Sequence, residues 1–122
     1  MDWKLELVPV PVTDVDRARD FYVDGVGFAC DFDQVVNEGL RFVQLTPPGS
    51  GCSIYLGVGI TDMAPGSQRT LQLVVDSADA AYAELTSRGV TAEEPVTLEW
   101  GRFTYFADPD GNQWAVQELP KR

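Results

Sequence analysis

The side chains that most often carry catalysis or bind metals are scarce in this chain of 122 residues, which contains no histidine. Its two cysteines, Cys30 and Cys52, lack the short spacing of metal-binding or redox pairs, and we expect both to be reduced thiols. A serine or cysteine nucleophile needs a neighbouring base, which without imidazole would have to be a lysine or a carboxylate. The sequence therefore predicts no metal, no cofactor, no disulfide and no catalytic residue that can be named.

Composition narrows the class of protein and its partners. The chain is 44% hydrophobic, which suffices for the core of a single domain spanning residues 1–122. Its formal net charge is −10, whereas a nucleic-acid surface needs clustered Lys and Arg, so we expect no nucleic-acid partner. No segment has the pattern of a signal peptide or a membrane span, so we expect a cytoplasmic protein with no membrane partner. The acidity fits either plain solubility or attraction for a cationic ligand.

The clearest local pattern is residues 102–118, in which two alternating segments flank the sequence Asp-Pro-Asp-Gly-Asn. Pro109 sets a turn φ and Gly111 accepts a positive φ, so the chain is expected to reverse direction there. Aromatic side chains at Phe103 and Tyr105 alternate with polar ones before the turn. The pattern predicts a β-hairpin with two differently used faces.

An imperfect copy of this pattern lies earlier in the chain. Arg41 and Pro48 match Arg102 and Pro109, each 61 positions later, and residues 12–18 match a segment that begins 63 positions later. A nearly constant offset at two places indicates duplication of a unit of about sixty residues. The predicted units are residues 4–58 and 70–119, joined by a linker at 59–69 that is rich in Gly, Pro and polar residues.

Each unit is predicted to contain the elements β-α-β-β-β. Strands are expected at residues 5–12, 28–33, 40–46, 52–58, 70–75, 96–99 and in the hairpin. Thr13 or Asp14 is expected to cap the first helix, and Asp76 or Ser77 the second. Because prolines within residues 5–12 remove backbone donors, the first strand should lie at an edge or pair on one side only.

The chain resembles the vicinal oxygen chelate superfamily, which groups glyoxalases, bleomycin-resistance proteins and extradiol dioxygenases. The resemblance is carried by VTDVDRARDFYVDGVGF at 12–28 and YFADPDGNQWAVQE at 105–118, and it covers nearly the whole chain. It implies an α+β fold in which two tandem β-α-β-β-β units form a curved mixed-sheet cup. It implies less about activity, because the superfamily includes lyases, epimerases, dioxygenases, thiol transferases and proteins that sequester antibiotics.

The metalloenzymes of this superfamily place one ligand in each of four strands. The resemblance maps those positions onto Leu7, Thr70, Ala115 and either Ile54 or Tyr55. None of these is a normal metal ligand, since a divalent metal site needs several imidazole, thiolate or carboxylate donors that converge on one point. We therefore expect no catalytic metal of the superfamily type.

Strand alternation predicts which side chains line the cup. Trp114 and the apolar residues in register with it should face the helices, so residues of the opposite parity should face the cavity. The predicted ligand-binding residues have that parity or lie on the connection beside it: Leu7, Phe42, Tyr55, Thr70, Gln72, Trp100, Phe103, Tyr105, Gln113 and Ala115. Such an aromatic and amide wall suits a flat or amphipathic molecule held by stacking and a few hydrogen bonds. We expect stacking on Trp100, Phe103 and Tyr105.

Three functions fit these features. The one we favour is a metal-independent binding protein that sequesters an aromatic or cationic natural product, as the antibiotic-resistance members of the superfamily do. The alternatives are a metal-independent lyase or isomerase acting on a small metabolite, with Tyr55 or Tyr105 and Glu99 in proton transfer, and a non-catalytic accessory module with a filled cup. The resemblance also implies a homodimer in which units from both chains complete each cleft.

Overall fold

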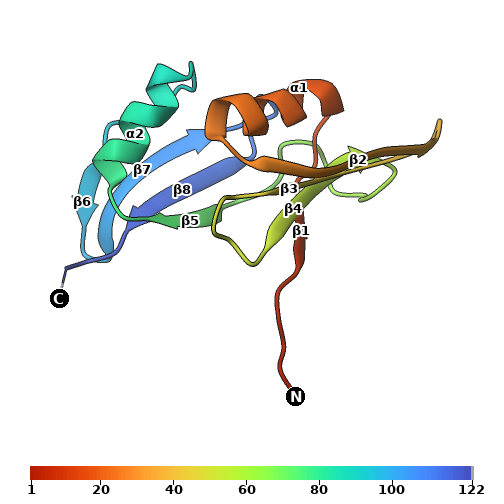
Figure 1. Cartoon of the computed structure of the whole chain (residues 1–122). Coiled ribbons are helices and arrows are strands. Elements are labelled where there is room, and N and C mark those ends of the chain that lie inside the picture. The colour runs from red at the N-terminus through yellow and green to blue at the C-terminus, as the bar shows by residue number, and fades with distance from the viewer. Residues whose placement is uncertain (122) are drawn as a thin grey trace.

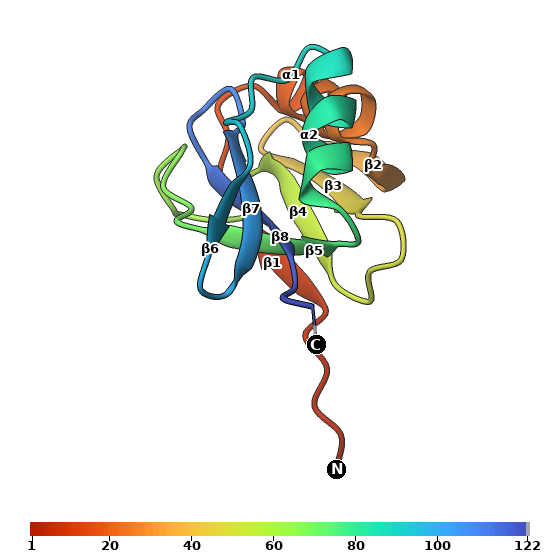
Figure 2. The ribbon, with the colours of Figure 1, turned by 90° about the vertical axis from the view of Figure 1, so that its left-hand side faces the viewer.

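The computed structural model describes residues 1–121, which form two four-stranded sheets and their helices. In chain order the elements are β1 (Leu7–Pro9), α1 (Val15–Asp20), the π-helical turn η1 (Phe21–Val26), β2 (Ala29–Asn37), β3 (Leu40–Thr46), β4 (Ser53–Val58), β5 (Leu71–Val75), α2 (Ala78–Ser87), β6 (Val96–Leu98), β7 (Gly101–Ala107) and β8 (Gln113–Glu118). The first sheet has the order β1-β4-β3-β2 and the second the order β5-β8-β7-β6. β1 pairs in parallel with β4, and β5 pairs in parallel with β8. The other neighbouring strands are antiparallel. The common order confirms the predicted α+β fold of two repeated units, with the helices on one side of the sheets (Figures 1 and 2).

Side-chain caps start both helices where the sequence places them. Asp14 accepts a hydrogen bond from the Arg17 backbone N–H at 3.0 Å, and Ser77 accepts one from the Ala80 N–H at 3.1 Å. Each bond satisfies a backbone donor that the first turn of a helix leaves free. After η1 the chain turns at Gly27, whose φ of 94° lies in the left-handed region that favours glycine.

Two strands differ in length from the prediction. The strand expected at residues 5–12 extends only over Leu7–Pro9, and Pro11, which cannot donate to a ladder, lies just beyond its end. Residues 1–6 are exposed and lead away from the body of the molecule (Figures 1 and 2). The strand expected at residues 28–33 continues to Asn37, since it forms a long hairpin with β3, and all nine of its residues are exposed.

An aromatic cluster on the helix side of the sheets joins the two units. The ring of Trp114 from β8 lies 5.7 Å from the rings of Tyr22 and Phe28, and 5.9 Å from Phe106, centroid to centroid. The Trp114 indole N–H donates to the Tyr22 hydroxyl at 2.9 Å, and that hydroxyl donates to the Asp108 carboxylate at 2.8 Å. Burial, followed by the charge of Asp108, raises the pKa of the Tyr22 phenol. The prediction that Trp114 faces the helices is confirmed.

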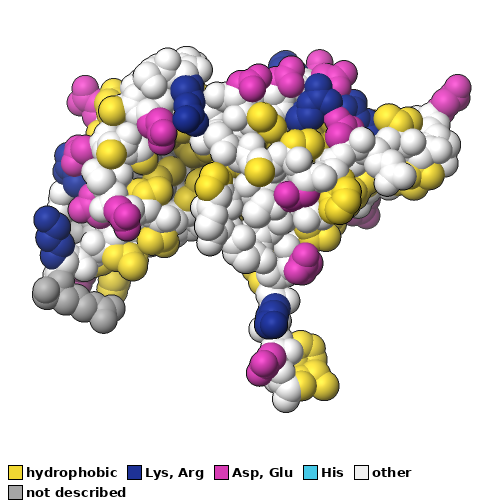
Figure 3. Space-filling model, in the orientation of Figure 1, with side chains coloured by type: hydrophobic (Ala, Val, Ile, Leu, Met, Phe, Trp, Pro, Cys, Tyr) yellow, Lys and Arg dark blue, Asp and Glu magenta, His cyan; other side chains and the backbone are white. Residues whose placement is uncertain are grey.

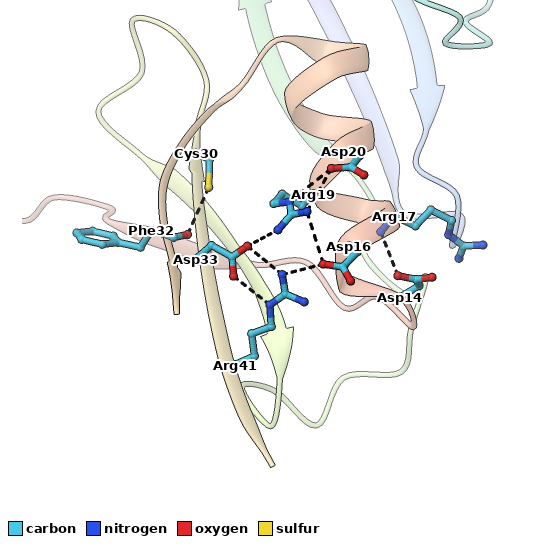
Figure 4. A network of polar contacts seen from close by, with 9 residues as sticks. All are labelled: Asp14, Asp16, Arg17, Arg19, Asp20, Cys30, Phe32, Asp33 and Arg41. Carbon is cyan, nitrogen blue, oxygen red and sulfur yellow. Dashed lines mark hydrogen bonds and ion pairs between the residues drawn. The ribbon is translucent and has the colours of Figure 1, made fainter. Parts of the chain in front are cut away.

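The same ion pair attaches the helix to the sheet in both units. Arg41 on β3 pairs with Asp16 on α1 at 2.9 Å, and Arg102 on β7 pairs with Asp79 on α2 at 3.0 Å. In the first unit Arg41 also donates to Asp33 on β2 at 3.0 Å, as Figure 4 shows. That hydrogen bond is the main cause that lowers the pKa of Asp33.

Candidate ligand-binding site

The faces of the sheets that point away from the core carry the predicted site residues. In the first sheet, Val43 and Ile54 are buried in the core, so Phe42 and Tyr55 lie on the opposite face. Their rings stack with centroids 5.7 Å apart and planes inclined by 27°. Leu7 shares this face, because it is in register with Ser53, two residues before Tyr55.

The second sheet repeats this arrangement with a more nearly parallel aromatic pair. Tyr105 is in register with Ala115, and Ala115 in turn with Gln72, so the three share one face. The rings of Phe103 and Tyr105 are nearly parallel, with centroids 5.9 Å apart and planes inclined by 5°. The Gln72 side-chain amide donates to Gln117, which lies on the same face. The face therefore has a stacked aromatic pair beside paired amides.

A cavity of about 480 Å³ opens at the end of the second sheet where β8 begins. Its lining combines three of the predicted ligand-binding residues with others from the hairpin and from the segment before β6: Thr70, Thr91, Ala92, Glu93, Tyr105, Phe106, Ala107, Gln113 and Trp114. Thr70 and Gln113 are exposed and offer hydroxyl and amide groups, while Tyr105 is half-buried. The space suits a planar molecule of moderate size with a few polar substituents.

The remaining predicted residues lie outside this cavity. Gln72 lines a separate cavity of about 300 Å³, which it shares with Thr70. Phe103 and Ala115 are buried in the second sheet, and the stacked Phe42 and Tyr55, together with Leu7, belong to the first sheet. Trp100, in the turn between β6 and β7, is 69% exposed. The described part of one chain therefore does not bring the ten residues into a single cup.

The segment from Thr91 to Glu93 is the part of the lining that sequence reasoning missed. Ala92 forms a bridge with Phe106 on β7, the Glu93 backbone N–H donates to the Tyr105 carbonyl at 2.9 Å, and the Thr104 hydroxyl donates to the Glu93 carbonyl at 2.6 Å. These long-range contacts fix the segment across the end of the hairpin. The pairing with β7 is interrupted after this segment. The sequence carries one signal of the interruption, Pro95, which cannot donate to a ladder.

The residues at the metal-ligand positions of the superfamily do not fit a metal ion. Leu7, Ala115 and Ile54 have no donor atom in their side chains, and Thr70 and Tyr55 offer neutral hydroxyls. Among residues 1–121, no group of three or more His, Cys, Asp or Glu side chains is placed to hold a metal ion. No helix in that part of the chain is long and apolar enough to cross a membrane.

Comparisons with known proteins agree with this fold. Residues 4–116 match the family model described as the glyoxalase/bleomycin resistance protein/dioxygenase superfamily. The crystal structure of TnmS3, an antibiotic-binding protein from Streptomyces sp. CB03234, is 39% identical over 98% of both chains, with a TM-score of 0.88. A superfamily member from Sphaerobacter thermophilus is 36% identical over 95% of this chain and 97% of its own, with a TM-score of 0.83. The uncharacterized protein YetH of Bacillus subtilis is 28% identical over 91% of this chain and 94% of its own. The chain belongs to the glyoxalase/bleomycin resistance protein/dioxygenase superfamily.

Proposed function

We propose that this protein binds an aromatic small molecule of the natural-product or antibiotic type in the 480 Å³ cavity and holds it without chemical conversion or a metal ion. The observation that carries the proposal is the half-buried Tyr105 ring on the wall of that cavity, which the hydroxyl of Thr70 and the amide of Gln113 also line. The similarity to TnmS3, which is an antibiotic-binding protein, supports the same function.

Stacking and burial would supply the affinity. Tyr105 is held parallel to Phe103, so its ring loses little conformational freedom when a ligand packs on it. Covering apolar surface contributes roughly 25 cal/mol per Å², and an aromatic contact adds about 0.5 to 1.5 kcal/mol. Thr70 and Gln113 would orient polar substituents of the ligand.

We further propose that the protein acts as a homodimer in which a second chain extends the cavity into a larger cleft. The stacked pair of Phe42 and Tyr55 and the exposed Trp100 lie outside the cavity of one chain, although their types and faces match a ligand wall. If these residues of one chain faced the second sheet of its partner, they would reach the ligand in the partner's cavity. Light scattering at micromolar concentration should give the mass of a dimer, and the mass of a monomer would contradict this proposal.

The binding proposal is tested by calorimetric titration of the full chain with 1-naphthalenemethanol, a neutral fused-ring probe. Tyr105→Ala should weaken binding about tenfold, because it removes both buried area and stacking. Tyr82→Ala, on α2 and outside the cavity lining, serves as the control and should leave the affinity unchanged. Equal affinity of the Tyr105→Ala variant and the original protein would contradict the proposal. So would conversion of the probe, detected by mass spectrometry after incubation.

Tyr55→Ala and Trp100→Ala extend the same titration to the proposed dimer. If a partner chain completes the cleft, each should also weaken binding. If only Tyr105→Ala has an effect, the ligand is held within one chain.

A further inference from the structure

The cavity contains one charged side chain, that of Glu93, and its position is set by the backbone around it. Ala92 faces the core and is in register with Phe106, so the next residue, Glu93, lies beside Tyr105 on the opposite face. Hydrogen bonds on both sides of Glu93, to the Tyr105 carbonyl and from the fully buried Thr104 hydroxyl, hold this backbone in place. The Glu93 side chain therefore leaves a fixed backbone beside Tyr105 and lines the same cavity as that ring.

No cation of the described chain neutralises this carboxylate. Among residues 1–121, the ion pairs within 4.0 Å involve Arg17, Arg19, Arg41, Arg88 and Arg102, and none of them uses Glu93. The cavity lining includes no lysine or arginine. Arg69, near the start of β5, donates instead to the Gly111 carbonyl at 3.1 Å. An acidic group thus remains available to whatever enters the cavity.

A carboxylate beside the face of an aromatic ring is the pair of groups that recognises a protonated amine. The carboxylate supplies an ion pair, and the ring attracts the cation through its quadrupole. The net charge of −10 adds a general attraction for cations, but the acidic side chains are spread over the visible surface in Figure 3 rather than gathered at one place. Local recognition at Glu93 and attraction by the whole protein can therefore be separated experimentally.

We infer that the ligand of this cavity is an aromatic molecule bearing a protonated amine, with the ring on Tyr105 and the ammonium group at Glu93. This inference rests on the proposed binding function and narrows the class of ligand. It makes Glu93 a specificity-determining residue that selects cationic over neutral and anionic aromatic molecules.

Three probes with the same ring system test this assignment: 1-naphthylmethylamine, a cation at pH 7, 1-naphthalenemethanol, which is neutral, and 1-naphthoic acid, an anion. The affinity of the full chain, measured by calorimetry, should fall in that order. We expect the amine to bind about five- to tenfold more tightly than the alcohol, in line with one exposed ion pair and one cation–π contact.

The variant Glu93→Gln removes the charge and keeps the size of the side chain. It should remove the part of the amine preference that the ion pair supplies and leave only the smaller cation–π contribution of Tyr105. The matched control is Glu94→Gln, the adjacent exposed acid that does not line the cavity, and this variant should retain the preference. Because Glu93 contributes to the fold through its backbone, melting curves of both variants should match that of the original protein.

The possible outcomes separate the inference from the proposed function. If the amine and the alcohol bind equally, or if Glu93→Gln keeps the full preference, the binding function stands and the role of Glu93 is refuted. If Glu94→Gln and Glu93→Gln reduce the preference equally, the overall charge of the protein is responsible and the inference is again refuted. If neither probe binds to any form of the protein, the proposed function itself fails.

Discussion

The two units share one pattern of elements but differ at the second strand, and in the second unit the corresponding segment lines the cavity. In the first unit β2 runs without interruption from Ala29 to Asn37 along β3. In the second unit the corresponding segment makes a single bridge at Ala92, is interrupted before Pro95, and pairs again only over Val96–Leu98. A proline cannot donate to a ladder, which accounts for the interruption of the strand at this point. A broken edge strand therefore distinguishes the second unit, whose segment from Thr91 to Glu93 lines the 480 Å³ cavity, from the first.

The ion pair that attaches the helix to the sheet is the same in both units. Arg41 and Arg102 occupy matching positions and pair with the matching acids Asp16 and Asp79. At the joint between the units, however, Tyr22 of the first unit matches Leu85 of the second, 63 positions later, and both are buried in the core. Within residues 1–121, the buried polar link to Trp114 and Asp108 is thus present once, through Tyr22.

The largest effect on stability is expected from a substitution in the aromatic cluster that connects the two units. Trp114→Ala should lower the free energy of unfolding by about 3 to 5 kcal/mol, because it leaves a large cavity in the aromatic cluster. Trp100→Ala is the matched control, since this indole is 69% exposed and its loss should change stability little. Urea denaturation followed by circular dichroism gives both values. A larger loss for Trp100→Ala would mean that the faces of the second sheet are assigned the wrong way round.

A smaller effect is expected at the polar link that only the first unit supplies. Tyr22→Phe leaves the Trp114 N–H and the Asp108 carboxylate without their shared partner and should cost about 1 to 3 kcal/mol at neutral pH. The folded state raises the pKa of the Tyr22 phenol, so its stabilising contribution is complete below the unfolded value of about 10 and is lost as pH rises above it.

Urea denaturation between pH 8 and pH 11 tests this dependence. The original protein should lose stability with a slope up to about 1.4 kcal/mol per pH unit steeper than that of Tyr22→Phe above pH ~10. The other three tyrosines are present in both proteins and cancel in the comparison. Parallel curves for the two proteins would show that the pKa of the Tyr22 phenol is the same in the folded and unfolded states.

The smallest effect concerns the ion pairs that both units share. Arg41→Ala should lower the free energy of unfolding by about 1 kcal/mol, since it removes both a half-buried ion pair and the packing of a long side chain. Arg102→Ala should lower it less, because Arg102 pairs with Asp79 alone whereas Arg41 also pairs with Asp33. Melting temperatures in low salt and in about 0.5 M NaCl provide the measurement. The salt screens the charges of the ion pairs, so the difference in melting temperature between the two variants should become smaller. A larger loss for Arg102→Ala would contradict the ranking.

Local signals in the sequence predicted most of the fold. The caps at Asp14 and Ser77 and the hairpin turn around Pro109 and Gly111 each depend on a few adjacent residues, and the structure has all of them. The alternation of residues 71–75 is also confirmed, with Leu71, Leu73 and Val75 packed against the core. The length of β2 was not predictable in this way, because it depends on pairing with β3.

The site was less predictable, because contacts distant in sequence assemble it. Strand parity placed Tyr105, Gln113 and Thr70 on one wall, but it carries no information about how far each lies from the others. Glu93 belongs to a segment with no regular pattern, and only its bridge to β7 brings it to the cavity. Parity therefore predicted which face each of these side chains occupies but not which of them line one cavity.

The three tryptophans also give the protein a built-in optical signal. Trp3 and Trp100 are 88% and 69% exposed, so an aqueous quencher such as iodide reaches their indoles. Trp114 is 3% exposed, lines the cavity and donates its indole N–H to Tyr22, so its emission should be blue-shifted and shielded from iodide. The fluorescence that survives quenching therefore comes from the residue that contacts both units and the cavity. Its change on titration would report occupancy without any added label.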